Sequence, residues 1–247
     1  MYFERLRKFG HAKNAIKCGD LKVTELTGRL LKNFSMKPDR SDFTKAEWEI
    51  IESHRTPRQV QAYLKSIPYN FEKRGETLVS FRQVVKRKSA HCLEAALAAA
   101  VILEQYGYPP LLLSFESIDQ LDHVLYVFKT DKGWGSVGRS RDNGLHGRKP
   151  VFRTARDLAL SYVDPYVDYT GRITGYAVVD LNELGNFDWR FASGNMWRLE
   201  QFLIDYPHRP IVTSDKRYQQ LLKKYTEFKA KYPDKQPMYY ENQETWM

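Results

Sequence analysis

The sequence predicts an α+β fold within one domain. Capping signals and helical apolar spacing dominate residues 44–106, whereas residues 111–137 are rich in β-branched and aromatic side chains between turn signals. The chain has 247 residues, of which 42% are hydrophobic and 14% aromatic, which is enough apolar material for a packed core. Since no Pro/Gly/Ser-rich linker divides it, we expect a single domain over residues 1–247. Its core should span about 60–182, between a helical part at about 1–59 and a helical extension at about 183–247.

Two capping boxes begin the predicted helices of the first part. Thr44 with Glu47 forms one box, and Thr56 with Gln59 forms the second, which also has Pro57 at its first helical position. A further short helix is expected around residues 77–85. In the second helix one buried face recurs at i, i+3, i+4 and i+7, and a proline then ends the helix (Val60, Tyr63, Leu64, Ile67 and Pro68).

A buried helix is predicted over residues 89–106. Its apolar side chains cover almost the whole circumference, which is typical of a helix at the centre of a domain. Ser89 is the expected N-cap, so Cys92 should occupy the third helical position, and Gly107 is the expected C-cap. Strands are predicted after it at residues 111–115, 123–130, 134–137 and 175–181, and further helices at 154–163 and 215–231.

The charge and cysteine content indicate the kind of compartment and partner. The net charge is +9 and the pI is near 9.3, so a nucleic acid or an acidic protein is one possible partner. Two cysteines cannot form a disulfide framework, which is typical of a reducing compartment, most simply the cytoplasm. No apolar run approaches the roughly 20 residues of a membrane span, and no secretory signal follows Met1, so we expect no membrane partner.

The position of Cys92 points to chemistry. The free amides and the dipole at a helix start favour negative charge, so the pKa of a thiol there should fall. The basic run at residues 86–88 should act in the same direction. The alternative is a small residue that only packs, but a thiolate is the nucleophilic form and the helix start favours the reactive interpretation.

A nucleophilic cysteine needs a base, and His123 is the candidate. It opens a predicted strand 31 residues after Cys92, a spacing that allows helix, turn, strand, turn and strand. An imidazole brought back to the helix start would pair with the thiolate and later protonate the leaving group. His91 is next to Cys92 in the sequence, but neighbours on a helix point about 100° apart, so we expect it to be a poor base.

Four features follow one another between residues 67 and 140: a cysteine at the start of an Ala-rich helix, Gly-Tyr-Pro before a strand, Asp-His opening the next strand and Gly-Trp on the return strand. This ordered set resembles the transglutaminase-like cysteine enzymes of the papain-like architecture. The resemblance implies a central buried helix packed on an antiparallel sheet, with helical N- and C-terminal decorations. It also implies Cys92 as nucleophile, His123 as base and a thioester formed from an amide or ester, followed by hydrolysis or transfer to an amine.

The chain departs from the family at the third catalytic position. The resemblance implies an Asp about four residues past Trp134, where Gly138 stands. The imidazole would then be oriented by Ser136 or Ser140, which share that strand face, by Asp142, by a backbone carbonyl, or by nothing. The oxyanion hole would use the Cys92 amide and a second donor, for which Gln83 is a candidate.

Other motifs carry less chemistry. The GxGxxG pattern at residues 133–138 should lie in a hairpin, because a dinucleotide site needs a helix after the glycines. The histidines and cysteines have no metal-ligand spacing, so we expect neither a metal nor a cofactor. A basic loop follows the predicted hairpin, and it either grips an anionic group of the substrate or is merely solvated (Arg139, Arg141, Arg148, Lys149, Arg153).

We therefore expect a cytoplasmic cysteine hydrolase or acyltransferase that acts on a peptide-like or amine/acyl substrate, possibly an anionic one. The alternative is a catalytically inactive chain of the same fold that serves as a basic module for a nucleic acid or an acidic partner.

Overall fold

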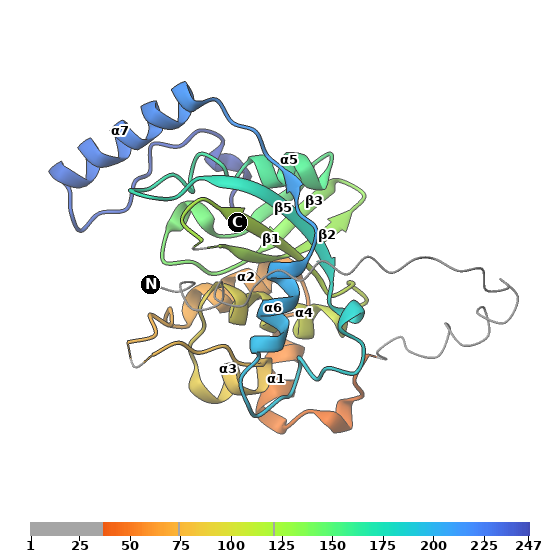
Figure 1. Cartoon of the computed structure of the whole chain (residues 1–247). Coiled ribbons are helices and arrows are strands. Elements are labelled where there is room, and N and C mark those ends of the chain that lie inside the picture. The colour runs from red at the N-terminus through yellow and green to blue at the C-terminus, as the bar shows by residue number, and fades with distance from the viewer. Residues whose placement is uncertain (1–36, 74, 121) are drawn as a thin grey trace, which may run out of the picture.

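The computed structural model describes residues 37–73, 75–120 and 122–247, so most of the predicted N-terminal helical part lies outside the described residues. The described chain is an α+β fold, as predicted, built on one six-stranded antiparallel sheet in the order β4-β3-β2-β1-β5-β6 (Figure 1). The strands are β1 (Leu111–Ser117), β2 (Val124–Thr130), β3 (Gly133–Val137), β4 (Arg148–Phe152), β5 (Ile173–Asp180) and β6 (Arg209–Pro210).

Seven α-helices surround this sheet in the part of the chain that is described. They are α1 (Lys45–Ser53), α2 (Pro57–Ser66), α3 (Phe81–Arg87), α4 (Cys92–Glu104), α5 (Ala155–Leu160), α6 (Trp197–Asp205) and α7 (Asp215–Lys231). Short 3-10 turns lie at Arg40–Asp42, Asn143–Leu145, Leu181–Leu184 and Gln243–Thr245. None of the described helices is long and apolar enough to cross a membrane.

Local sequence signals explain where the first helices begin and end. Thr44 and Thr56 cap α1 and α2, and the carboxylate of Glu47 and the amide of Gln59 close the two predicted boxes. The short helix predicted at residues 77–85 is α3, which begins later, after Ser80. The buried helix ends at Glu104 with Gln105 as its C-cap, two residues before the predicted end, so Gly107 is not the cap. Gly107 has a φ of 84°, and the amide of Tyr108 after it donates to the carbonyl of Leu103.

The start predicted for the buried helix was wrong. α4 begins at Cys92 with His91 as its N-cap, so Cys92 is the first helical residue and Ser89 is not a cap. The reason is a pairing that the sequence does not reveal: the amide of Asn70 donates to the carbonyl of Ala90, and the amide of Ala90 donates to that of Pro68. This pairing holds residue 90 beside residues 68–70, and the helix can begin only after it.

Helix α4 is the centre of the larger of two apolar cores. Every residue of α4 after Cys92 is buried, as the sequence predicts for a helix apolar on all sides. It packs on one sheet face, formed by Leu112, Val124, Tyr126, Phe128, Val137, Ala177 and Val179. The opposite face packs against α5 and the residues after it through Leu113, Phe115, Leu125, Val127, Ile173, Leu158 and Tyr162. The sheet is therefore apolar on both faces.

Three elements are absent from the prediction. Strand β4 lies in the segment that the sequence predicts as a basic loop. It was not predicted because Pro150 within it is untypical of a strand. Helix α6 begins after Met196, which is not a typical cap, and β6 has only two residues. The GxGxxG segment does form the β2–β3 hairpin, as expected, with no helix after it.

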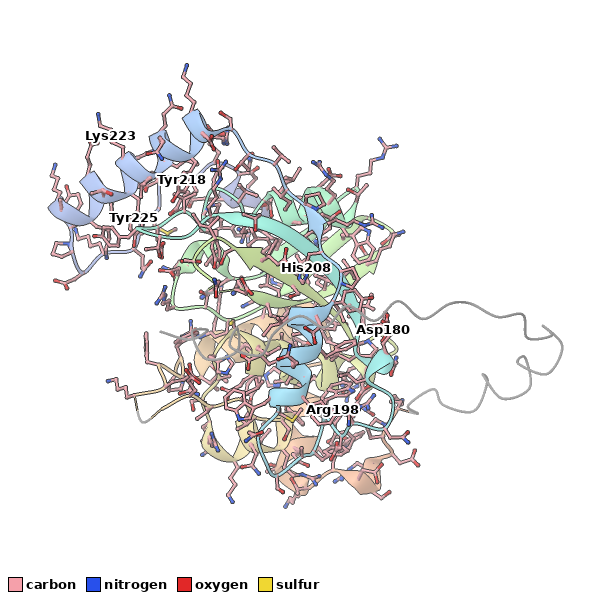
Figure 2. The ribbon with its side chains drawn as sticks, viewed as in Figure 1. Asp180, Arg198, His208, Tyr218, Lys223 and Tyr225 are labelled. Carbon is pink, nitrogen blue, oxygen red and sulfur yellow. The ribbon has the colours of Figure 1, made fainter. Side chains whose placement is uncertain are left out.

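Helix α7 has the predicted bounds but stands away from the rest of the molecule (Figure 1). Its apolar stripe rests on aromatic contacts: Tyr225 packs edge-on against Tyr169, and Arg172 lies over the ring of Tyr218 at 4.9 Å. In Figure 2 both tyrosines lie on the inner side of α7, whereas Lys223 extends from its outer side. No residue of α7 is fully buried.

Candidate active site

A cleft of about 1120 Å³ opens where helix α4 meets the ends of strands β1 and β2. Cys92, His91 and His123 all line it. Other walls come from residues 69–72 and 75–76, from the segment between β3 and β4, from helix α6 and from His208, which lies between α6 and the sheet in Figure 2. Side chains after α5 and in the C-terminal part complete the lining (Pro165, Tyr166, Asp168, Tyr225, Gln236, Pro237 and Tyr240). The structure thus brings the predicted nucleophile and the predicted base into one open cavity.

Cys92 has the environment of an ionised thiol. It is a free, half-buried cysteine at the first position of α4. Burial by itself would raise the pKa of the Cys92 thiol, but hydrogen bonds with His123 and His91, together with the charges of the two imidazoles, hold that pKa well below its usual value. The exposed basic residues 86–88 are not among these causes, so the imidazoles replace them as the source of the shift.

His91 also forms a hydrogen bond with the thiol, although neighbours on a helix would point about 100° apart. As the N-cap it has extended backbone (φ −87°, ψ −174°), so the helical angle between neighbours does not apply to it. Burial lowers the pKa of His91, but the hydrogen bond with Cys92 and the charge of Glu94 outweigh this and raise it to about 9. Its Nε2 atom also lies 2.9 Å from the carbonyl oxygen of Thr77. His91 is therefore a charged neighbour of the thiol.

Glu94 secures this arrangement. The carboxylate is fully buried and accepts the backbone amide of His91 at 3.0 Å, as the third residue of a capping box does. Its other oxygen lies 3.5 Å from Nε2 of His91. The sequence carried this signal, because a Glu three residues after a cap residue marks a helix start, but a histidine in the cap position hides it.

His123 is oriented by a backbone carbonyl, one of the alternatives left open by the sequence. It directly precedes β2, and its Nε2 atom lies 3.0 Å from the carbonyl oxygen of Leu145. The ring stacks parallel to Phe115, with centroids 6.5 Å apart. Since Nε2 is engaged with the carbonyl, Nδ1 is the nitrogen left for the thiol.

The loop that supplies this carbonyl is fixed by Arg148. The side chain is fully buried, and its guanidinium donates to the carbonyls of Gly144 at 2.6 Å and His146 at 2.9 Å. It also lies over the ring of Tyr162 at 4.2 Å, and the hydroxyl of Tyr162 donates to the same His146 carbonyl. Arg148 is therefore a structural clamp on the loop and does not reach the cleft.

The other candidates for the third position are engaged elsewhere. The hydroxyl of Ser136 pairs with Tyr162 at 2.6 Å, and that of Ser140 accepts the amide of Asp142 at 3.2 Å. The carboxylate of Asp142 pairs with Arg141 at 3.3 Å. None of the three has a hydrogen bond to His123 within the described part of the chain.

Gly138 occupies a position with no room for a side chain. A Cβ atom there would lie 2.1 Å from Cδ2 of Leu125, and the amide and carbonyl of Gly138 both bond to the buried side chain of Gln61. An Asp at this position would therefore need Leu125 to move. Packing thus excludes an Asp side chain at residue 138, and the carbonyl of Leu145 is the group that contacts Nε2 of His123.

The second predicted oxyanion donor does not reach the cleft. Gln83 lies on α3, half-buried, and is not among the residues that line the cavity. Tyr69 does line it, next to Cys92, because the pairing of residues 68–70 with Ala90 brings this segment to the helix start. Burial and the charge of Cys92 raise the pKa of Tyr69, so its hydroxyl keeps its proton and is a hydrogen-bond donor.

The electrostatic character of the cleft is opposite to that of the whole chain. Nine of its lining residues are Asp or Glu, whereas Arg141 is the one Arg or Lys among them in the described residues. Arg141 pairs with Asp142 and lies 3.7 Å from Asp168. The basic loop therefore does not offer a free cation to an anionic substrate at this surface.

The described residues contain no group of three or more His, Cys, Asp or Glu side chains that could hold a metal ion. No protein-family model matches the chain, and no curated protein matches its sequence.

Proposed function

We propose that the chain is a cysteine hydrolase or acyltransferase of the transglutaminase-like kind, with Cys92 as nucleophile and His123 as base. One observation carries the proposal: a thiol at the first turn of a buried helix interacts with two imidazoles and lines an open cleft. A cysteine that only packs would not have a strongly lowered pKa or a cavity beside it. A perturbed nucleophile in a cleft is a typical feature of a catalytic site.

The first half of the reaction is acyl transfer to sulfur. The Cys92 thiolate attacks the carbonyl carbon of an amide or ester, a carbon–sulfur bond forms, and the carbonyl electrons move to oxygen. The free amide of Cys92 and the hydroxyl of Tyr69 are the donors available to this oxyanion. When the carbonyl re-forms, the carbon–nitrogen or carbon–oxygen bond breaks, and His123 gives its proton to the leaving amine or alcohol.

The second half releases the acyl group. Water or an amine loses a proton to Nδ1 of His123 and attacks the thioester, and the thiolate departs. Leu145 holds the ring throughout through its carbonyl, so His123 can accept and give the proton at the same nitrogen. Hydrolysis and transfer share the thioester intermediate and differ only in which nucleophile enters.

The two imidazoles have different roles in this proposal. His91 has a pKa of about 9 and keeps its proton near neutral pH, which suits a fixed positive charge beside the thiolate. His123 contacts the carbonyl of Leu145 through Nε2, which leaves Nδ1 to exchange the proton. His91 is therefore a positioning and charge-stabilising residue, and His123 is the proton carrier.

The test is the alkylation rate of Cys92 by iodoacetamide across pH 5–9, followed by mass spectrometry of the peptide that contains it. We expect fast labelling of Cys92 below pH 7, with a midpoint well under the roughly 8.5 of a free thiol. Cys18, followed in the same digest, shows how a second cysteine of the same chain behaves. Labelling of Cys92 no faster than that of glutathione at every pH would overturn the proposal.

A further inference from the structure

The carboxylates around Cys92 fall into two groups. Those on the side of His123 are engaged: Asp122 accepts the amide of Ser117 at 2.9 Å, and Asp168 accepts two amides and lies near Arg141. On the side of His91, Glu200 on α6 and the exposed Glu76 have no hydrogen bond or ion pair within the described residues. Two carboxylates beside the nucleophile therefore have oxygens available to a ligand.

These available carboxylates lie close enough to repel one another. Burial, together with the negative charges of Glu76, Glu72 and Cys92, raises the pKa of Glu200 to about 7 against the opposing charge of His91. One imidazolium thus faces four acidic groups. A cation bound among them would remove this repulsion, which is the kind of electrostatic complementarity that selects a charged ligand.

The far wall of the cleft repeats this charge. Glu116 on β1 is exposed, with its carboxylate 3.5 Å from Nδ1 of His208, and Asp119 and Asp122 follow it in the loop before β2. Negative charge therefore lies on both sides of the reactive pair. A volume of about 1120 Å³ exceeds what a single small amine fills, and it suits an extended peptide of several residues.

We propose that the cleft takes a basic peptide, whose Lys or Arg side chains next to the reacting carbonyl pair with Glu200 and Glu76. This substrate class rests on the proposed function, because it describes the acyl donor at the same thiol. It differs from the anionic substrate that the basic loop suggests in the sequence, since Arg148 of that loop is buried and Arg141 is paired.

The first test measures the sign of the potential at Cys92 with matched reagents. The cationic trimethylammonium-ethyl methanethiosulfonate and the anionic sulfonatoethyl methanethiosulfonate each convert a thiolate into a mixed disulfide and release methanesulfinate. At pH 8 and low salt, we expect their rate ratio at Cys92 to exceed the ratio for 2-mercaptoethanol by about tenfold or more, and to fall as salt screens the carboxylates. A ratio at or below that of 2-mercaptoethanol would overturn the proposal.

Two variants locate the effect. Glu200→Gln and Glu76→Gln should each lower the ratio on the order of threefold, because each removes one negative charge near the sulfur. Glu52→Gln makes the same chemical change on the exposed surface of α1, outside the cleft, and should leave the ratio unchanged. Equal effects of all three substitutions would show that only the overall charge matters, and would contradict the assignment.

The second test does not depend on a reactive thiol. Fluorescein-labelled hexalysine and hexaglutamate are titrated with the full chain, and binding is read as fluorescence anisotropy. We expect hexalysine to bind and the Glu76→Gln/Glu200→Gln double variant to weaken it about tenfold, with Glu52→Gln as control. If Cys92 proves unreactive while hexalysine binds, the proposed function fails and the basic ligand stands. If Cys92 is reactive but hexalysine binds no better than hexaglutamate, the basic ligand is ruled out and the proposed function stands.

Discussion

The Nε2 atom of His123 lies 3.0 Å from the carbonyl oxygen of Leu145. A carbonyl fixes the ring and its tautomer, as a carboxylate would, but adds no full negative charge beside the imidazolium. The contact is therefore expected to hold the ring in place and to leave Nδ1 for the thiol. In the same site His91 is close to the carboxylate of Glu94. In the proposed mechanism, His123 transfers the proton and His91 supplies the positive charge.

Replacing His123 tests whether its imidazole lowers the pKa of the Cys92 thiol. In His123→Asn the Cys92 thiol loses a hydrogen bond and a positive charge, so its pKa should rise and its alkylation by iodoacetamide at pH 6.5 should slow about tenfold or more. The pH profile of labelling reports the change. His54→Asn alters a histidine at the end of α1 that does not line the cleft, where Nδ1 lies 2.7 Å from the Ile50 carbonyl, and serves as control. An unchanged pH profile of Cys92 labelling in His123→Asn would show that the His123 imidazole does not act on the thiol.

Arg148 should be important for stability although it is a charged residue. Arg148→Met leaves the carbonyl of Gly144 without its buried donor and that of His146 with only the hydroxyl of Tyr162, so we expect the free energy of unfolding to fall by about 2–4 kcal/mol. Urea denaturation of the full chain measures the loss. Arg153→Met, at an exposed position just after β4, should cost less than about 0.5 kcal/mol. Equal losses in both variants would contradict the clamp.

The pH dependence of stability should follow the pair of His91 and Cys92. A raised pKa of about 9 for His91 stabilises the fold at low pH, and this stabilisation is lost as pH rises through 9. The lowered pKa of Cys92 acts in the other direction: its contribution is present above the thiol's unfolded value and is lost as pH falls through the folded value. The charged pair therefore persists in the window between the two folded values.

Glu94→Gln tests this linkage. Without the carboxylate the pKa of His91 should fall, because the imidazolium loses a nearby anion, and that of Cys92 should also fall, because the thiolate loses a like charge two residues away; each change should be about one unit or less. Thiolate absorbance at 240 nm against pH gives the shift for Cys92. Glu52→Gln is the matched control on α1. A Cys92 titration that is the same in both variants would show that Glu94 does not act on the thiol.

Gly138 should tolerate no side chain. A Cβ atom there would meet Leu125 at 2.1 Å, so Gly138→Ala should cost about 1–3 kcal/mol, and Gly138→Asp should cost at least as much without raising activity. The double variant Leu125→Ala/Gly138→Ala should lose less stability than the sum of the losses in the two single variants. Gly194→Ala, where a Cβ would have open space, is the control. Thermal unfolding measures the stability of these variants and of Leu125→Ala alone.

Local patterns in the sequence predicted much of the fold. The capping boxes at Thr44 and Thr56, the all-round apolar surface of α4 and the turn at residues 131–133 are each contained within a few neighbouring residues. For the same reason the thiol at a helix start could be found without a structure. The start of α4 was misplaced because it depends on Ala90 pairing with residues 68–70, which no local pattern reveals.

The orientation of the site depends on contacts between distant residues. His91 was set aside on helical geometry, which fails at an extended N-cap, and the Leu145 carbonyl has no side-chain signature at all. The acidic lining is collected from five separated stretches of chain, so no charge run predicts it. By contrast, the basic run at residues 139–153 is visible in the sequence, yet Arg148 in it is buried.

The sheet is apolar on both faces, and this affects how β2 must align with its neighbours. Sliding β2 by one residue exchanges one apolar set, headed by Val124, for another, headed by Leu125, so burial alone barely penalises the error. The same slip would take His123 away from the Phe115 ring and the Leu145 carbonyl that hold its imidazole. Close fits guard against it: Gly135 lies under the Phe128 ring and Gly138 under Leu125. Two glycines of one hairpin therefore help to keep β2 in the register on which the position of His123 depends.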